Sequence, residues 1–273
     1  IHQEALKFIR DNKEQNFFMY AAYTLPHADL DQPNDSILQK YVGRFCETPT
    51  NGGGYKPTDK PRAQFAGMVT RLDTYVGELV AELKKQGLYD NTVFIFTSDN
   101  GPHTEGGADP NFFNTEKRLR GFKRSLYEGG VRVPFIAVWP NHIEANSINH
   151  SVAAGWDMLP TFRELLGKNE SWTQETDGLS ILPTLTNEGT QAQHDYLYFE
   201  FHEEGGRQMV RQGDWTLIRQ KINSTNPILE LYNINDDLHQ DIELSAKYPD
   251  KVQELKNLMD NSRTQSPMFN FGK

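Results

Sequence analysis

Asp99 and Asn100 place a carboxylate and an amide side by side directly after a short apolar segment. That segment, Thr92 to Thr97, is rich in β-branched and aromatic residues, and the turn sequence Ser98-Asp99-Asn100-Gly101-Pro102 follows it. Oxygen donors of this kind suit a hard cation, calcium or magnesium, better than zinc or copper. Ser-Asp-Asn-Gly is also ordinary turn chemistry. The metal interpretation therefore needs support from other parts of the chain.

The elements that would position these residues form a parallel α/β pattern. A continuous apolar run between turn signals, as at Thr92 to Thr97, predicts a strand buried on both faces of a parallel sheet. Two further runs, Phe17 to Tyr23 and Val133 to Trp139, predict similar strands, and the first leads into His27. Arg62 to Gln86 has helical apolar spacing and connects two of these strands. Ligands in such sheets bind at the carboxyl ends of the strands, where Asp99 and His27 are expected.

Other segments complete the expected organisation. Helices are predicted at His2 to Lys13, Trp156 to Leu166 and Pro249 to Met259. Asp29 to Arg62 is interrupted by Pro and Gly and predicts a long surface loop. The polar stretch from Pro183 to Gln193 suggests a boundary, with an α/β domain over 1–190 and a subdomain over 191–273. Strands of an antiparallel sheet are predicted in that subdomain at YLYFEFH, RQMVRQGDWTLIRQ and ILELYNI, with alternation in WTLIR.

Composition excludes several classes of protein. The 273 residues are 37% hydrophobic and 11% aromatic, which is enough for a packed core, and their net charge is −9. A negative chain is a poor partner for nucleic acid or an anionic membrane, and no run of about 18 apolar residues predicts a membrane span. The single cysteine, Cys46, rules out an internal disulfide framework. The start at Ile1 suggests a mature protein or a fragment of a longer one.

Three motifs together carry a specific resemblance. SDNGPHTEGG, LRGFK and YEGGVRVPFIAVWP, in this order and spacing, resemble the sulfatase family of the alkaline phosphatase superfamily. AAYTLPHADL at 21–30, DGLSILPTL at 177–185 and VRQGDWTLI at 210–218 extend the resemblance over nearly the whole chain. It implies an alkaline-phosphatase-like α/β fold, a mostly parallel sheet flanked by helices, with a small C-terminal antiparallel sheet and helix.

The resemblance also assigns roles to individual residues. Asp99 and Asn100 would supply part of a calcium shell, with magnesium as the alternative. Lys123 would place a point charge on a sulfate oxygen, although a lysine beside several arginines is usually solvated. His27 matches the substrate-binding histidine of the family. His103 would approach the ester oxygen or the sugar, or it would cap its loop.

Weaker candidates follow from the same resemblance. Arg120 and Asp109 would position substrate, with a surface ion pair and a loop cap as the ordinary alternatives. Glu128-Gly129-Gly130 is interpreted as backbone architecture, with the glycines allowing a close turn. A charged group in the C-terminal region would either border a sugar pocket or form a solvated edge; it comprises His202, Glu203, Glu204, Arg207 and Arg211.

The nucleophile of the family is missing from these 273 residues. It is a formylglycine made from the Cys or Ser of a C/S-x-P/A-x-R motif, and Cys46 lies in CETPTNG, which does not match. The adjacent aspartates that complete the metal shell in the family are also missing, since Asp236-Asp237 lies near the C-terminus. The chain therefore resembles the C-terminal portion of a sulfatase and is predicted to be inactive alone. We also expect self-association or rearrangement at an exposed sheet edge.

These observations predict a sulfuric ester hydrolase of the arylsulfatase type that acts on carbohydrate sulfates, when joined to an N-terminal half carrying the formylglycine. One alternative is a non-catalytic domain that binds sulfated glycans. Another is a phosphodiesterase or mutase of the same superfamily, which would require several Asp and His ligands for paired transition metals. The expected partner is a sulfated small molecule or glycan, and the expected location is periplasmic, secreted or lysosomal rather than integral to a membrane.

Overall fold

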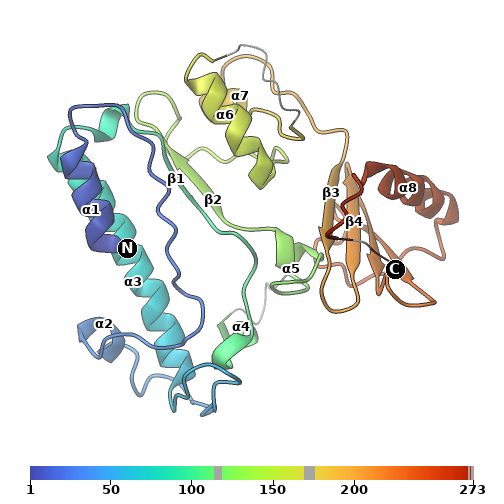
Figure 1. Cartoon of the computed structure of the whole chain (residues 1–273), viewed down its shortest axis with the longest axis horizontal. Coiled ribbons are helices and arrows are strands. Elements are labelled where there is room, and N and C mark those ends of the chain that lie inside the picture. Colours follow the sequence, from blue (N-terminus) through green and yellow to red (C-terminus); the bar gives the residue numbers. More distant parts are fainter. Residues whose placement is uncertain (114–118, 169–175, 270, 272–273) are drawn as a thin grey trace. The chain divides into compact units, whose positions relative to one another are not determined.

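The computed structural model describes residues 1–113, 119–168, 176–269 and 271 (Figure 1). The chain forms two compact units. The first comprises Ile1–Ile95, His103–Thr115 and Val138–His142, and the second comprises Phe96–Pro102, Glu116–Ala137 and Ile143–Lys273. In the described part of the chain, no helix is both long enough and apolar enough to cross a bilayer. The proposed division near residue 190 remains a prediction.

The first unit is built on two helices. Helix α1 (His2–Asp11) lies alongside α3 (Pro61–Lys85), as Figure 1 shows. Ala5 and Ile9 of α1 pack against Leu79 and Leu83 of α3 in one buried cluster. Both helices were predicted from the spacing of these apolar residues, and α3 ends before Gly87, whose φ of 72° suits a helix terminus. Both helix predictions are confirmed to within two residues at each end.

The segment Phe17 to Tyr23 is not a strand, so that prediction is wrong. Its residues nevertheless alternate in exposure: Phe17 and Met19 pack on the α1–α3 cluster, whereas Phe18 and Tyr20 are 66% and 83% exposed. This period of two is that of extended backbone with one covered face. A strand also needs a neighbouring strand to complete its ladder of hydrogen bonds. In the described part of the chain, no strand pairs with this segment.

Two of the predicted buried strands exist but are shorter and more exposed than expected. Strand β1 (Phe94–Thr97) is hydrogen-bonded to β2 (Phe135–Val138) in a two-stranded sheet. Phe135 and Ile136 are 42% and 57% exposed, so the expectation of burial on both faces is wrong. In the described part of the chain this sheet has only two strands. Such a narrow sheet has few neighbours to cover its faces.

The second unit contains the predicted antiparallel sheet. Strands β3 (Leu197–Phe201), β4 (Arg207–Gln212), β5 (Trp215–Gln220) and β6 (Ile228–Asn233) pair in sequence order. Helix α8 (Pro249–Ser262) covers one face, where Leu255 and Met259 meet the alternate side chains Val210, Leu217 and Leu231. The opposite face buries Met209, Ile218 and Tyr232 against Leu126. The antiparallel sheet predicted for this region is confirmed, and both of its faces are buried.

Shorter elements connect these parts. They are α2 (Ser36–Gln39), η1 (Tyr89–Asn91), η2 (Glu105–Gly107), α4 (Pro110–Phe113), α5 (Glu128–Val131), η3 (Gly155–Asp157), α6 (Met158–Leu165) and α7 (Leu182–Thr186). The predicted loop over residues 29–62 is largely irregular apart from α2, and the predicted helix over 156–166 is present as η3 and α6.

Candidate active site

Two predicted site histidines lie together in the first unit. The rings of His27 and His103 are stacked, with centroids 5.1 Å apart and an interplanar angle of 18°. They come from different loops, 24–29 and 102–107, so the tertiary fold creates the pair. His103 is only 7% exposed, whereas His27 is partly exposed. His27 is therefore the member of the pair that solvent and a ligand can reach more easily.

The hydrogen bonds of His103 define its protonation. The backbone N–H of Glu105 donates to Nδ1 at 3.2 Å, so Nδ1 carries no proton in this arrangement. Nε2 then carries the proton and donates to the carbonyl oxygen of Pro26 at 3.0 Å. Both ring nitrogens of this neutral histidine bind the backbone. This geometry favours the loop-capping alternative, and a contact with substrate stays a prediction.

His27 has a different pattern. Its Nδ1 donates to the carbonyl oxygen of Ala28 at 2.8 Å, and its Nε2 lies 3.2 Å from a carboxylate oxygen of Glu105. The contact of His27 with substrate stays a prediction.

In the second unit, three motifs are joined through their backbones. The N–H of Gly101 donates to the carbonyl oxygen of Gly130 at 2.9 Å, and the N–H of Lys123 donates to the carbonyl oxygen of Pro102 at 2.8 Å. A Cβ at Gly101 would lie 1.9 Å from the oxygen of Gly129, so only glycine permits this approach. The turn that carries Asp99 and the loop that carries Lys123 are therefore held side by side.

The donor set at this turn fits a hard cation in part. Asn100 donates through Nδ2 to the carbonyl oxygen of Gly101 at 2.8 Å, which leaves its side-chain oxygen as the atom able to face a metal. The adjacent Asp99 is exposed, so its carboxylate is accessible. Calcium takes six to eight oxygen ligands. Within residues 1–113, 119–168, 176–269 and 271, no group of three or more His, Cys, Asp and Glu side chains could hold a metal. Asp99 and Asn100 would thus supply only part of a shell, and their role as metal ligands stays a prediction.

Arg120 lies in the same loop as Lys123, and its guanidinium forms hydrogen bonds within the protein. Its Nη1 donates to the hydroxyl of Tyr232 at 2.9 Å and to the carbonyl oxygen of Gln240 at 2.7 Å. Its Nη2 donates to the hydroxyl of Tyr127 at 3.1 Å, and the guanidinium lies 4.1 Å from the centre of the Tyr127 ring. These contacts give Arg120 a structural role. Its predicted contact with substrate remains untested.

Asp109 forms both an ion pair and a loop cap, which are the two ordinary alternatives to a contact with substrate. Its carboxylate accepts from Arg62 at 2.9 Å and caps α4 by accepting from the N–H of Phe112 at 3.1 Å. The hydrogen bond from Arg62 is the main cause that lowers the pKa of Asp109.

Cys46 is exposed. Asp237 closes a turn, since its carboxylate accepts from the N–H of Ile242.

The charged group of the C-terminal region forms ion pairs both within itself and with neighbouring residues. His202 and Arg263 both bind Glu200, each at 2.9 Å. Arg207 binds Glu204 at 2.6 Å. Burial lowers the pKa of the Arg211 guanidinium. Most of the group therefore forms ion pairs, and its contact with a sugar stays a prediction.

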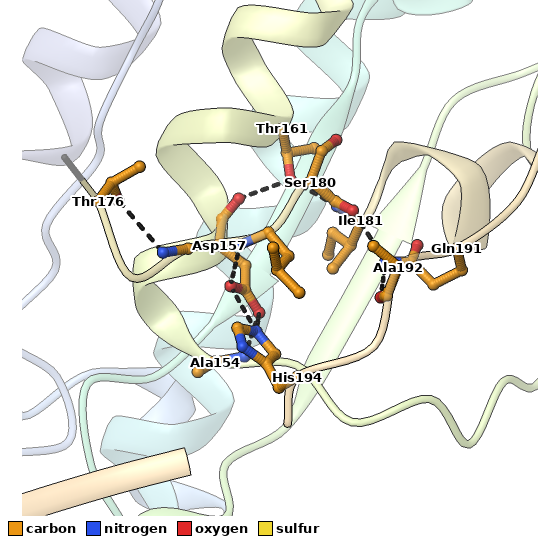
Figure 2. A network of polar contacts seen from close by, with 11 residues as sticks. Ala154, Asp157, Thr161, Thr176, Ser180, Ile181, Gln191, Ala192 and His194 are labelled. Carbon is orange, nitrogen blue, oxygen red and sulfur yellow. Dashed lines mark hydrogen bonds and ion pairs between the residues drawn. The ribbon is translucent and has the colours of Figure 1, made fainter. Parts of the chain in front are cut away.

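A buried polar network was missed by sequence reasoning (Figure 2). Asp157 is fully buried, and its carboxylate accepts from His194 Nε2 at 2.9 Å and from the N–H groups of Ala154 and Leu179 at 2.7 and 2.9 Å. Thr161 continues the network by accepting from the N–H of Ile181 at 2.9 Å. No local pattern links Asp157 with His194, 37 residues away. Its dense intramolecular bonding indicates a structural role.

The helices, the two sheets and the joined loops define a mixed α/β protein with an alkaline-phosphatase-like fold. A model of the sulfatase family matches residues 1–168, and a model of the N-sulphoglucosamine sulphohydrolase C-terminal region matches residues 120–265. The chain belongs to the sulfatase family.

Individual relatives agree with this assignment. N-acetylgalactosamine-6-sulfatase from Rattus norvegicus is 31% identical over 190 residues, which cover 67% of this chain and 31% of the relative. Arylsulfatase A from Homo sapiens is 30% identical and is matched over 69% of this chain and 36% of its own length. The crystal structure of Ps i-CgsB in complex with k-i-k-neocarrahexaose superposes with a TM-score of 0.77 at 28% identity, over 95% of this chain and 53% of that one. The chain therefore spans about a third of the length of these curated relatives.

Proposed function

We propose that this chain is the part of a sulfuric ester hydrolase that binds the sulfate group of a sulfated carbohydrate. The observation that carries the proposal is the backbone connection between the turn of Asp99 and the loop of Lys123, through Lys123 N–H and Pro102 oxygen at 2.8 Å. A cation bound by the oxygen-rich turn and the ammonium group on the adjacent loop would be suited to opposite sides of one tetrahedral anion.

The chemistry required is stabilisation of negative charge. Cleavage of a sulfate ester leaves charge on the peripheral oxygens of sulfur and on the departing alkoxide, and fixed cations stabilise it. Lys123 would act on a sulfate oxygen, and His27 remains a predicted contact of the substrate. A calcium ion bound by Asp99 and Asn100 would supply Lewis-acid stabilisation of the same oxygens. The precursor motif of a formylglycine is not among these 273 residues, so we expect no turnover by them alone.

The substrate class rests on the relatives. One is named as acting on a 6-sulfated N-acetylgalactosamine, and one neighbour was solved with a neocarrahexaose. A sulfated glycan is therefore the proposed partner, and a periplasmic, secreted or lysosomal location the proposed compartment. The rival candidates are a sulfated-glycan-binding domain without catalysis and a superfamily phosphodiesterase. Metal analysis separates the latter, because calcium supports the sulfatase and zinc supports the phosphodiesterase.

Isothermal titration with N-acetylgalactosamine 6-sulfate in calcium tests the proposal. We expect Lys123→Ala to weaken binding about tenfold, since a charge-assisted hydrogen bond is lost. Unsulfated N-acetylgalactosamine should bind to the unmodified chain and to Lys123→Ala no more tightly than the sulfated sugar binds to Lys123→Ala. Equal binding of the sulfated and unsulfated sugars by the unmodified chain would contradict the proposal. Hydrolysis of a chromogenic aryl sulfate by the 273 residues alone would contradict the expected inactivity.

A further inference from the structure

A glycine-rich loop of the first unit, residues 50–58, has a fixed shape. Its first and last residues, both threonines, exchange two backbone hydrogen bonds of 2.9 and 3.1 Å. Within the loop, the N–H of Tyr55 donates to the carbonyl oxygen of Gly52 at 3.0 Å. The three glycines at 52–54 have positive φ, and a Cβ at Gly52 would lie 2.1 Å from the carbonyl oxygen of Tyr55. Glycine is therefore required for this tight turn, which fixes the backbone of Tyr55.

The same loop is attached to the segment that follows the predicted substrate-binding histidine. The carboxylate of Asp29 accepts from the N–H of Lys56 at 2.8 Å. Gly106 lies between the two segments: a Cβ there would come within 2.9 Å of the Cβ of Ala28 and within 3.7 Å of the Cβ of Tyr55. The three pieces of backbone are therefore closely packed, and Tyr55 has a defined position in the first unit.

Tyr55 faces His27 across this junction. The centroids of the two rings are 6.3 Å apart and their planes are inclined by 69°, which is an edge-to-face arrangement. The side chain of Tyr55 is partly exposed. In the described part of the chain, no group forms a hydrogen bond with its hydroxyl. Tyr55 therefore offers a ligand part of an aromatic ring and a phenol that can donate or accept a hydrogen bond.

The charged groups next to Tyr55 make contacts within the protein. Lys56 pairs with Asp31 at 2.6 Å, and its N–H is bound by Asp29. A sugar ring has C–H groups on one face and hydroxyl groups at its edge, which match an aromatic ring and a phenol. The loop thus fits an uncharged sugar ring better than a second anion.

We propose that Tyr55 contacts the sugar ring that carries the sulfate ester, through its aromatic ring and its hydroxyl, and that it contributes to the choice of sugar. The inference rests on the proposed function, in which His27 is a predicted contact of the substrate. Because the loop is already folded, little conformational entropy is lost when a ligand binds to it. A phenol that binds a sugar hydroxyl also discriminates against substrates that lack this hydroxyl.

The test separates the sugar from the sulfate by titration of two ligands in calcium, N-acetylgalactosamine 6-sulfate and methyl sulfate. Tyr55→Ala should weaken binding of the sugar about tenfold and binding of methyl sulfate less than about twofold, because only the first ligand has a ring. Tyr55→Phe keeps the aromatic ring and should recover most of the loss. In saturation-transfer NMR, irradiation of the aromatic protons of the protein should reach the ring protons of the sugar, and Tyr55→Ala should weaken this transfer.

Tyr89→Ala is the matched control. Tyr89 is also a partly exposed tyrosine of the first unit, but it packs on the α1–α3 cluster, so this variant shows the effect of a tyrosine lost elsewhere in the unit. It should leave both affinities unchanged. An unchanged affinity of Tyr55→Ala for the sugar, equal losses for both ligands, or the same loss in Tyr89→Ala overturns the role of Tyr55. If methyl sulfate binding then still depends on Lys123, the proposed function stands; if neither ligand binds at millimolar concentration, both proposals are rejected.

Discussion

The guanidinium of Arg120 donates to the hydroxyl oxygen of Tyr232 across 2.9 Å, although 112 residues separate them. Tyr232 lies on β6, and Arg120 opens the loop that contains Lys123. The same guanidinium binds the carbonyl oxygen of Gln240, and the side chain of Gln240 accepts from the N–H of Glu128 at 2.7 Å. The C-terminal sheet and its following loop therefore hold the loop of the candidate site.

Arg120→Lys tests this structural role. Lysine keeps the charge but cannot bind three oxygens in the planar geometry of a guanidinium. We expect a loss of about 1–3 kcal/mol in the free energy of unfolding, measured by urea denaturation. Arg44→Lys, at an exposed position, serves as the control and should change stability little. Equal stability of Arg120→Lys and the unmodified chain would contradict the role.

Asp157→Asn tests the buried network of Figure 2. The amide would place an NH₂ group against donors that now meet a carboxylate, from Ala154, Leu179 and His194. The cost should be about 2–3 kcal/mol, because a buried donor would lose its acceptor. Thermal unfolding gives the measurement. Asp177→Asn, at an exposed site shortly before Leu179, should have a small effect, and a similar loss in both variants would argue against the network.

Gly130→Ala tests the close packing of the Glu-Gly-Gly turn. A Cβ at this position would lie 2.1 Å from the carbonyl oxygen of Ser125, so the backbone has to shift. Overpacking of this kind should destabilise the chain by about 3 kcal/mol. Gly77→Ala is the contrasting variant, because no atom lies within 4 Å of its Cβ in the middle of α3. It should stabilise by about 0.5–1 kcal/mol, and similar urea midpoints for both variants would contradict the packing argument.

Glu200 makes stability depend on acid pH. Partial burial opposes its ionisation, but hydrogen bonds from Tyr198 and His202 outweigh burial and lower the pKa of Glu200. Arg263 acts in the same direction. Folding thus favours the ionised form, so the stabilisation is complete above the ordinary pKa of a glutamate and disappears as the pH falls through the lower folded value.

The corresponding experiment measures urea unfolding between pH 7 and pH 3. Glu200→Gln should be less stable at pH 7 and should lose less stability on acidification than the unmodified chain. Glu188→Gln, at an exposed position, should keep the original pH dependence. Parallel pH curves for the chain and Glu200→Gln would show that this carboxylate is not responsible.

The exposed aromatic residues of the extended segment predict self-association. Phe18 and Tyr20 are 66% and 83% exposed on backbone that has the period of a strand. An extended segment of this kind can pair with the same segment of a second copy of the chain. Light scattering should show a mass that rises with concentration, and Phe18→Ser with Tyr20→Ser should reduce it. Ile148→Ser removes a side chain that is 82% exposed elsewhere and should not. A monomeric mass at all concentrations would contradict the prediction.

The sequence by itself determined the elements whose signals are local. Helical spacing defined α1, α3 and α8, alternation in WTLIR indicated β5, and the order of three motifs was enough to indicate the sulfatase family. These signals arise because the periods of 3.6 and 2 residues are properties of the backbone. The roles of Asp99 and Lys123, which the family resemblance implies, stay predictions.

The tertiary structure decided what depends on neighbours distant in the chain. Phe17 to Tyr23 has the composition of a strand, but a strand also requires a partner for its hydrogen bonds, and composition does not encode one. The oxygens that accept hydrogen bonds from Arg120 belong to Tyr232 and Gln240, far along the chain, and the stacking of His27 on His103 joins two loops. The contact of Arg120 with substrate stays a prediction. Asp157 and His194 gave no signal because a buried pair is defined by distance in space, which sequence spacing does not fix.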